Sequence, residues 1–243
     1  MTGPPARWSR VRGICFDLGG TLVRAEPEPT TGLVARLLGI SLERARLVIE
    51  DGPKRRRTTP EELAGDLATA FHRPSLLGPL VSVLDRARQR ASAPELFPDT
   101  VPALAALRQR GFALYGLTNS LGSSVPETPP PALHDLLDDV FHSADIGAVK
   151  PEREAFAHVE RVSGLTPREL LLVGDSLRAD VVGAASAGWH GAWLDRQRPA
   201  GHPRPDPLDA PRLHRLTSLP PLLPARPAEA LTREPEVRDG ADL

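Results

Sequence analysis

The chain has 243 residues, enough for one large domain, or for a domain with a smaller inserted module, around a substantial hydrophobic core. Its 30 basic and 31 acidic residues give a formal net charge of -1, so no overall electrostatic field attracts nucleic acid or an anionic membrane. We therefore expect a small-molecule ligand, with no nucleic acid partner and no membrane partner.

The cysteine content and the apolar runs predict where the protein works. Cys15 is the only cysteine, which excludes an internal disulfide framework and is typical of a reducing compartment. No apolar run approaches the ~18 residues of a membrane-spanning helix, and the N-terminus lacks the apolar segment of a leader peptide. The sequence predicts a soluble, cytoplasmic protein and does not decide between a monomer and a homodimer.

The first predicted strand covers residues 11–16, an unbroken apolar run that ends at Asp17. Gly19 and Gly20 follow, so we expect a tight loop that presents the Asp17 carboxylate. An Asp at the end of a strand is more often a turn or cap residue, so Asp17 alone does not identify a site.

Residues 24–94 carry apolar side chains at helical spacing, which predicts a small helical module inserted directly after the loop of the first strand. From this position such a module can close over a site as a lid. A basic run, KRRR at residues 54–57, lies between two of its predicted helices; it is either a solvated loop or a contact for an anionic substrate. Its first residue, Lys54, is one of two lysines in the chain, the other being Lys150.

Strands and helices alternate after this insertion. Helices are predicted at residues 101–109 and 152–164, and strands at residues 112–117, 170–173 and 191–194. Apolar runs without alternation are typical of strands that are buried on both faces of a parallel sheet. The order predicts an α/β fold with a doubly wound parallel sheet, whose ligands bind at the carboxyl ends of the strands.

The C-terminal part of the chain divides into two segments. An apolar patch at residues 213–223 predicts a final helix that packs against the core. Residues 225–243 are polar and rich in proline, a composition typical of a disordered tail.

Three acidic residues are expected to meet at one edge of the sheet. Asp175 and Asp180 belong to the segment GDSLRAD, which follows a predicted strand, and Asp17 ends another. Three converging carboxylates repel one another unless protons or a cation neutralise them. Hard oxygen ligands with open positions are typical of a Mg²⁺ site.

Hydrogen-bond donors and a cation are expected beside these carboxylates. Thr118, Asn119 and Ser120 end the predicted strand at residues 112–117 and offer donors to phosphoryl oxygens. Lys150, in the segment VKPE, offers a positive charge to the same anion.

The ordered segments FDLGGTL, LTNS, VKPE and GDSLRAD resemble the four motifs of the haloacid dehalogenase-like (HAD) hydrolase superfamily. The resemblance covers about residues 11–223. It implies a Rossmann-like core at residues 1–23 and 95–224, with residues 24–94 as a helical cap of the C1 type and residues 225–243 as a tail.

The resemblance also implies roles for the singled-out residues. Asp17 is then the nucleophile that forms an aspartyl-phosphate, while Thr118, Asn119 and Lys150 orient and neutralise the phosphoryl group. Mg²⁺ would be held by four ligands: the side chain of Asp17, the backbone carbonyl of Gly19, Asp175, and Asp180 directly or through water. Substrate-binding residues would be Thr118, Asn119, Ser120, Lys150 and Lys54. The implied enzyme is a Mg²⁺-dependent phosphatase acting on a small phosphorylated metabolite.

Gly19 departs from the family pattern, because phosphatases of the family usually carry a second Asp there. That Asp protonates the leaving alkoxide and then activates water, and such acid–base catalysis contributes on the order of 10²–10⁴-fold. The expected metal ligand at position 19 is a backbone carbonyl, which glycine retains. The departure therefore affects proton transfer more than metal binding.

Several explanations of Gly19 remain open. The substrate has a good leaving group, such as an acyl phosphate, or a cap residue such as Glu50, Asp51 or His72 supplies the proton. Alternatively, the protein binds a phosphate ligand without turnover. A further alternative is cleavage of a carbon–phosphorus bond, with Lys54 as a Schiff base, or of a carbon–halogen bond; the retained Asp175 and Asp180 argue against the latter.

Overall fold

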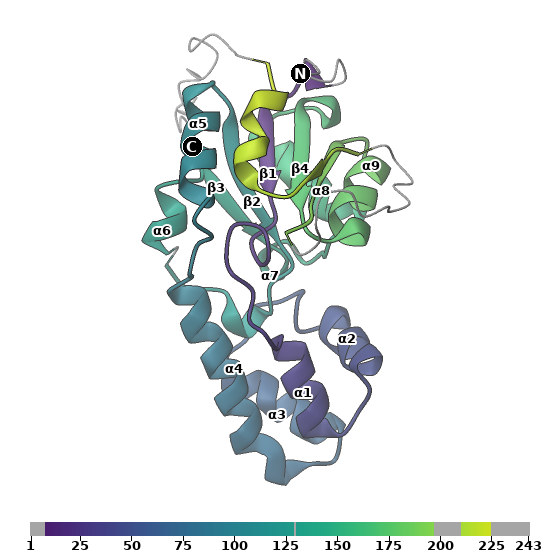
Figure 1. Ribbon diagram of the computed structural model, residues 1–243. Helices are drawn as coiled ribbons and strands as arrows, with labels where there is room; N and C mark the ends of the chain where they lie inside the picture. Colours follow the sequence, from purple (N-terminus) through teal and green to yellow (C-terminus); the bar gives the residue numbers. More distant parts are fainter. Residues whose placement is uncertain (1–7, 129, 197–209, 225–243) are drawn as a thin grey trace, which may run out of the picture.

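The computed structural model describes residues 8–128, 130–196 and 210–224, and its centre is a six-stranded sheet with the order β3-β2-β1-β4-β5-β6 (Figure 1). All neighbouring strands are parallel, which confirms the predicted doubly wound α/β fold. The strands are β1 (Gly13–Phe16), β2 (Ala113–Thr118), β3 (Asp139–His142), β4 (Leu170–Gly174), β5 (His190–Leu194) and β6 (Arg212–Leu213).

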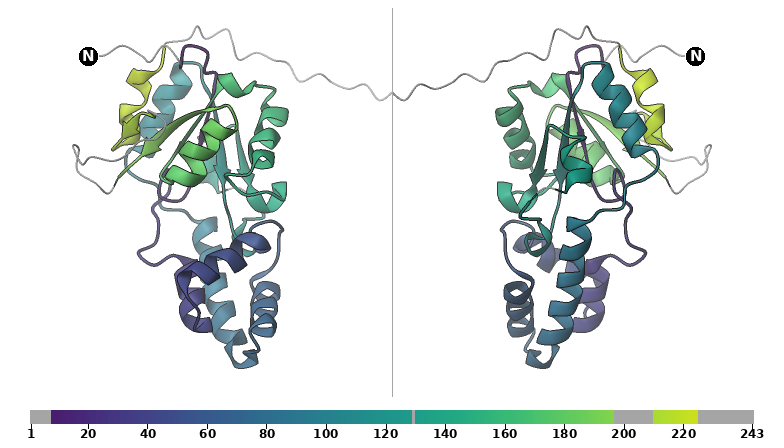
Figure 2. Two further views of the ribbon diagram at one scale, coloured as in Figure 1. Left: turned by 90° about the vertical axis from the view of Figure 1, so that its right-hand side faces the viewer. Right: turned by 90° about the vertical axis from the view of Figure 1, so that its left-hand side faces the viewer.

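Helices cover both faces of the sheet (Figure 2). Successive strand residues point to opposite faces, so Ile14 and Phe16 contact one layer while Cys15 contacts the other. The first layer contains α5 (Thr100–Gln109) and α6 (Pro131–His134), and the second contains α8 (Arg153–Ser163) and α9 (Gly183–Ser186). A further short helix, α7 (Ser143–Ile146), follows β3. Cys15 is fully buried, and burial raises the pKa of its thiol, so it is a core residue.

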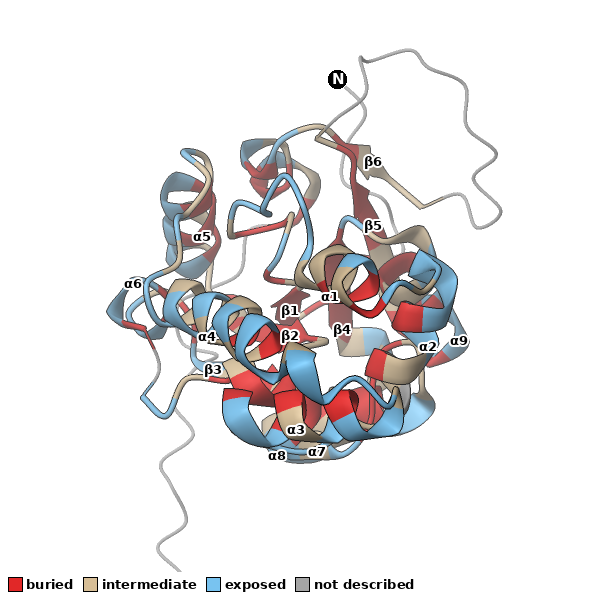
Figure 3. Cartoon of the chain, turned by 90° about the horizontal axis from the view of Figure 1, so that it is seen from below, coloured by how far each residue is buried: buried red, intermediate tan, exposed pale blue. Residues whose placement is uncertain are grey.

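A separate group of four helices stands below the carboxyl ends of the strands (Figures 1 and 3). These helices are α1 (Thr30–Leu38), α2 (Leu42–Asp51), α3 (Pro60–Ala70) and α4 (Leu77–Ser92). Their buried apolar side chains form a cluster that Leu121, from the segment after β2, also joins, and their outer faces are exposed. The N-terminus of α3 is fixed by a capping box, in which the side chains of Thr59 and Glu62 each accept a hydrogen bond from the other's backbone N–H.

The two chain segments that join this helical group to the sheet lie side by side. The N–H of Arg24 donates to the carbonyl of Glu95 over 2.8 Å, and the N–H of Phe97 donates to that of Leu22 over 3.0 Å. An isolated antiparallel bridge pairs Val23 with Leu96. The chain therefore enters and leaves the helical group through one double-stranded connection directly after the loop that holds Asp17.

Two edge elements differ from the sequence prediction. Strand β3, with the sequence DVFH, was not predicted, because only Phe141 of its four residues is fully buried. The predicted final helix at residues 213–223 is wrong: the segment forms β6 and two 3₁₀ turns, Leu216–Ser218 and Pro220–Leu222. Consecutive prolines at positions 220 and 221 remove the N–H groups that an α-helix needs.

The predicted packing of this last segment on the core is observed, since Leu213, Leu216, Leu219 and Leu223 are buried against β1 and α5. The predicted tail at residues 225–243 lies outside the described residues. No helix in the described ranges has the length and apolar character needed to cross a membrane.

Candidate active site

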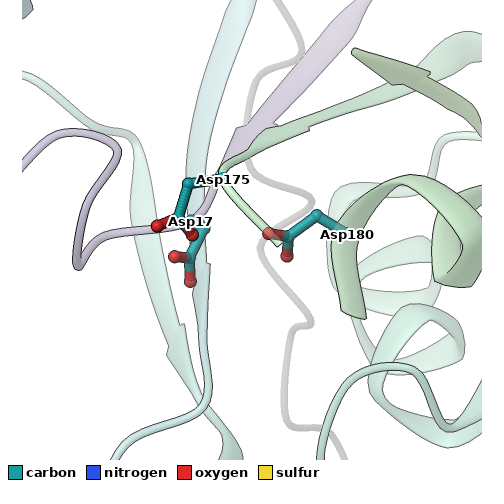
Figure 4. Close-up of side chains that lie close together, drawn as sticks. All are labelled: Asp17, Asp175 and Asp180. Atoms are coloured by element: carbon teal, nitrogen blue, oxygen red, sulfur yellow. The ribbon is translucent and has the colours of Figure 1, made fainter. Parts of the chain in front are cut away.

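Asp17, Asp175 and Asp180 converge at the carboxyl edge of the sheet (Figure 4). Asp17 follows β1, Asp175 follows β4, and Asp180 lies in the π-helical turn Leu177–Val182. One carboxylate oxygen of each residue lies within 4.8 Å of the corresponding atoms of the other two. The three side chains thus meet at one edge of the parallel sheet, as expected from the sequence.

Two glycines make room for these carboxylates. Gly20 has a φ of +79°, and a β carbon on it would lie 2.3 Å from Oδ2 of Asp175. A β carbon on Gly174 would lie 2.1 Å from Oδ2 of Asp180. Any larger residue at either position would displace a carboxylate, and the positive φ of Gly20 adds a conformational cost for other residues.

Lys150 joins two of the three carboxylates. Its Nζ donates to Oδ1 of Asp17 over 2.9 Å and to Oδ1 of Asp180 over 2.7 Å, and its side chain is 2% exposed. Burial lowers the pKa of Lys150, but Asp17 and Asp180 outweigh this effect together, so the pKa lies above its usual value. The lysine is therefore a permanent cation between the two acids.

One lysine does not balance three acids. Burial, and then the charge of Asp180, raise the pKa of Asp17 in spite of Lys150. The pKa of Asp175 is raised to about 7, because its carboxylate is partly removed from water and faces Asp17 and Asp180. A divalent cation would relieve this crowding, and three carboxylates with oxygen donors are the ligands that Mg²⁺ prefers. The donor set therefore fits a Mg²⁺ ion.

The polar residues after β2 are linked to Lys150 and to the segment after β3. The amide of Asn119 donates to the carbonyl of Lys150 over 2.9 Å and accepts from its N–H over 2.8 Å. The N–H of Ser120 donates to the hydroxyl of Ser143 over 3.0 Å. The side chain of Asn119 is thus occupied in fixing the backbone of Lys150, while Thr118 ends the strand beside it.

His142 is a polar residue at this edge that the sequence did not single out. It ends β3, pairs in register with Thr118, and its Nδ1 lies 2.9 Å from the hydroxyl of Ser120. Burial lowers its pKa, opposed in part by Asp145. No motif marks this position, so only the sheet order reveals it.

The basic run at residues 54–57 connects the helical group to the core. Arg55 forms a double hydrogen bond with Glu152, at 2.5 and 2.7 Å. Arg57 forms a similar pair with Asp145, with its Nη2 2.9 Å from Oδ2. These two arginines therefore bind carboxylates outside the helical group, although the Arg57 side chain remains 49% exposed to solvent.

The other two residues of the run have different surroundings. Arg56 pairs with Asp66 within the helical group, and both side chains are more than half exposed. Lys54 is 18% exposed, and its nearest carboxylate, Glu50, lies 4.0 Å away. Of the four cations, Lys54 alone combines burial with a weak ion pair.

A cavity of about 770 Å³ lies between the helical group and the sheet. Its wall includes Leu18 and Gly19 beside Asp17, three polar residues at the end of β2, and Lys54 from the helical group. The three polar residues are Thr118, the last residue of β2, and Asn119 and Ser120, which follow it. A volume of this size accommodates a small metabolite next to the carboxylates.

The space around Gly19 is open, since a β carbon there would meet no atom within 4 Å. Of the suggested substitutes for the missing acid, Glu50 lies beside Lys54, and the side chain of Asp51 lies outside the described part. His72 is exposed beyond the C-terminal end of α3 and does not line this cavity.

A family model for haloacid dehalogenase-like hydrolases matches residues 11–188, well over half of the chain. The chain belongs to the haloacid dehalogenase-like hydrolase family. The segments FDLGGTL, LTNS, VKPE and GDSLRAD all lie within the matched residues. The resemblance inferred from these motifs is confirmed.

Curated relatives of this HAD-like chain include two phosphatases. A glyceraldehyde 3-phosphate phosphatase of Methanopyrus kandleri is 36% identical over 93 residues, covering 38% of this chain and 40% of that protein. A phosphoserine phosphatase of Thermus thermophilus is 36% identical over 110 residues, covering 45% of this chain and 44% of that protein. In both cases the match spans less than half of the relative's length.

Solved structures share the HAD-like fold over most of their length. A 2-haloacid dehalogenase of Pseudomonas syringae pv. Tomato gives a TM-score of 0.62 at 22% identity, covering 87% of this chain and 97% of the other. The HAD-hydrolase YfnB of Bacillus subtilis, solved bound to magnesium, gives a TM-score of 0.53 at 23% identity. The match covers 86% of this chain and 97% of YfnB. At these identities the likeness establishes the fold alone.

Proposed function

We propose that this HAD-like hydrolase is a Mg²⁺-dependent phosphatase of a small phosphorylated metabolite, acting through an aspartyl-phosphate at Asp17. The observation that carries the proposal is the position of the Asp17 carboxylate. It is held 2.9 Å from Nζ of Lys150, beside Asp175 and Asp180, and its neighbour Gly19 lines a cavity of about 770 Å³. This arrangement supplies a nucleophile, a cation and a metal-binding donor set at one point.

The side chains that would hold Mg²⁺ are Asp17, Asp175 and Asp180, with the backbone carbonyl of Gly19. When bound, the ion would neutralise charge on the phosphoryl oxygens. The charge of Lys150 opposes the rise in the pKa of Asp17 that burial and Asp180 cause, and it would also stabilise the transferred phosphoryl group.

The residues after β2 hold the other side of the phosphoryl group. Thr118 and Ser120 offer hydroxyl donors to its oxygens. Asn119 acts through its two hydrogen bonds to the backbone of Lys150, so we assign it a positioning role. The cavity would hold the organic part of the substrate.

Phosphate is favoured over a haloacid by the acids around Asp17. Displacement of halide needs no metal, whereas Asp180 raises the pKa of both Asp17 and Asp175, a crowding of negative charge that a cation would relieve. The phosphatase relatives support the same choice.

We also propose residues 1–23 and 95–224 as the catalytic core and residues 24–94 as its cap, in a soluble cytoplasmic enzyme. The paired connection at Leu22–Arg24 and Glu95–Phe97 supports these boundaries. Lys54 is the cap residue that we place against the substrate.

Hydrolysis of p-nitrophenyl phosphate and acetyl phosphate with Mg²⁺ tests the proposed function. Both substrates have leaving groups that need no strong acid. We expect turnover by the wild type, its loss on chelation, and a loss of at least ~10³-fold in Asp17→Asn. Activity that survives both changes would exclude the mechanism.

Gly19→Asp is the informative companion variant, because the space beside Gly19 is open and its backbone tolerates a side chain. We expect a higher rate on alkyl phosphates, whose leaving groups need protonation. A wild type that is silent while Gly19→Asp is active would instead identify a phosphate-binding protein without turnover.

A further inference from the structure

Lys54 occupies the cap side of the cavity, opposite the residues that surround Asp17. Its side chain is 18% exposed, and it lines the same cavity as Gly19, Thr118 and Asn119. The carboxylate of Glu50, at 4.0 Å, is too distant for a hydrogen bond to Nζ. The ammonium group therefore keeps donor capacity for a molecule in the cavity.

The backbone on both sides of Lys54 is attached to the core. The carbonyl of Pro53 accepts a 2.6 Å hydrogen bond from the N–H of Gly122. On the other side, Arg55 pairs with Glu152 at 2.5 and 2.7 Å. A β carbon on Gly122 would lie 1.7 Å from the carbonyl oxygen of Arg56, so the two backbones are in direct contact. Lys54 thus sits at a fixed point over the carboxyl ends of the strands.

The electrostatic surroundings of Lys54 include the nucleophile. Burial lowers the pKa of Lys54; Glu50 and Asp17 oppose this effect, while Lys150 and Arg46 add to it. For His142, the charges that matter are those of Asp145, Arg57 and Asp139. The charge of Asp17 therefore acts on Lys54, which lines the cavity.

The arginines of the cavity wall do not compete for this role. Arg57 and Arg90 are paired with Asp145 and Glu26, and a guanidinium does not release its proton at physiological pH. A lysine ammonium can release its proton, and partial burial makes this easier.

We propose that Lys54 is the acid and base that replaces the missing carboxylate at position 19. The assignment rests on the proposed phosphatase function and extends it to unactivated alkyl phosphates. In the first step an Asp17 oxygen bonds to phosphorus, the bond from phosphorus to the leaving oxygen breaks, and a proton from Nζ of Lys54 moves to that oxygen. In the second step the neutral amine accepts a proton from water as the water oxygen bonds to phosphorus and the bond to Asp17 breaks. Lys54 returns to its charged form, and orthophosphate is released.

The test compares two esters that differ in their need for an acid, p-nitrophenyl phosphate and glycerol 2-phosphate. In Lys54→Met we expect kcat to fall about 10²-fold or more on glycerol 2-phosphate and less than about threefold on p-nitrophenyl phosphate. Lys54→Arg should show the same selective loss, because it keeps the charge without a transferable proton. Arg56→Met, in the same loop but on the exposed cap surface, is the matched control and should behave as the wild type.

A bypass variant separates proton transfer from folding and binding. Gly19→Asp combined with Lys54→Met should recover activity on glycerol 2-phosphate, since the family's usual carboxylate then supplies the proton. The alkaline limb of the wild-type pH profile on this ester should move to lower pH in that double variant, because a carboxylic acid loses its proton at lower pH than an ammonium group. Circular dichroism of Lys54→Met and Lys54→Arg confirms that the fold is kept.

Three results would overturn the assignment. An equal loss on both esters, or a rise in KM with unchanged kcat, would show that Lys54 binds substrate without transferring a proton. If the wild type hydrolyses p-nitrophenyl phosphate but not glycerol 2-phosphate, the acid–base role of Lys54 is refuted, whereas the proposed phosphatase function is not. A wild type inactive on both esters and on acetyl phosphate would refute the proposed function itself.

Discussion

Gly19 and Gly20 are adjacent in the chain but meet different surroundings. A β carbon on Gly20 would lie 2.3 Å from Oδ2 of Asp175, at a φ of +79°, whereas one on Gly19 would meet nothing within 4 Å. Gly20 is thus required by the carboxylate next to it, and Gly19 leaves space on the cavity wall. A side chain can be introduced at position 19 without displacing the carboxylate of Asp175.

Gly20→Ala is therefore expected to weaken metal binding by about 10–100-fold, because the methyl group displaces the carboxylate of Asp175. Gly19→Ala is the matched control and should bind as tightly as the wild type. Titration calorimetry with Mg²⁺ measures both affinities without a substrate. Equal affinities in the two variants would contradict the placement of Asp175 as a ligand.

The residues of the site were predictable to different degrees. Asp17, Asp175 and Lys150 stand out because each follows an apolar run or a turn, and parallel strands bring such ends together. The hydrogen bonds of the Asn119 side chain were not predictable from the sequence, since its amide binds the backbone of a residue 31 positions away. His142 gave no signal because the strand that it ends is short and only partly buried.

The loop between α2 and α3 is the element that ties the cap to the core. Arg55 and Arg57 both pair with core carboxylates, and their hydrogen bonds lower the pKa of Glu152 and of Asp145. Such a lowered carboxyl pKa gives stability that is present above the usual carboxyl pKa and is lost as the pH falls through the lowered value. The attachment of the cap should therefore weaken in acid.

A double-mutant cycle of Arg55→Met and Glu152→Gln tests this attachment. We expect a coupling of about 0.5–1 kcal/mol at pH 7, modest because both side chains are partly exposed, and a smaller value as the pH falls toward 3. Urea unfolding gives the four free energies of unfolding. The Arg56–Asp66 pair, which lies within the cap, is the control and should show a coupling near zero. A coupling that is independent of pH would contradict an ion pair.

The extent to which a strand is buried determined whether the sequence could predict it. Strands β1, β2, β4 and β5 carry unbroken apolar runs because helices cover both of their faces. The edge strands β3 and β6 are short and mixed in polarity, so they carry no such run. The C-terminal segment shows helical spacing of Leu213, Leu216 and Leu223, but prolines restrict it to 3₁₀ turns. The carboxylates that pair with Arg55 and Arg57 could not be predicted, because these pairs form through tertiary contacts that leave no periodic pattern in the sequence.

Across the whole molecule, negative charge is concentrated at the candidate site, and Lys150 alone does not balance it. The formal net charge of the chain is close to zero, yet three carboxylates and one lysine meet at a single point. These carboxylates come from β1, β4 and the π-helical turn, so they exist as a site only in the folded chain. Binding of a cation is consequently linked to folding.

Mg²⁺ should therefore raise the melting temperature. A concentration of about 100 times Kd stabilises the folded state by about 2.7 kcal/mol, or about 5–10 °C for a chain of this size. Differential scanning calorimetry with and without Mg²⁺ measures the shift, and Asp175→Asn should abolish most of it. An equal shift in wild type and variant would place the ion elsewhere.

Direct capture of the phosphorylated chain is the measurement that tests the central claim most closely. The wild type, mixed with radiolabelled acetyl phosphate and Mg²⁺ and quenched in acid, should carry a hydroxylamine-sensitive label, up to one per chain, on the peptide that contains Asp17. Asp17→Asn should carry none. Turnover by the wild type without any label on that peptide, or a label that persists in Asp17→Asn, would contradict an aspartyl-phosphate at this residue.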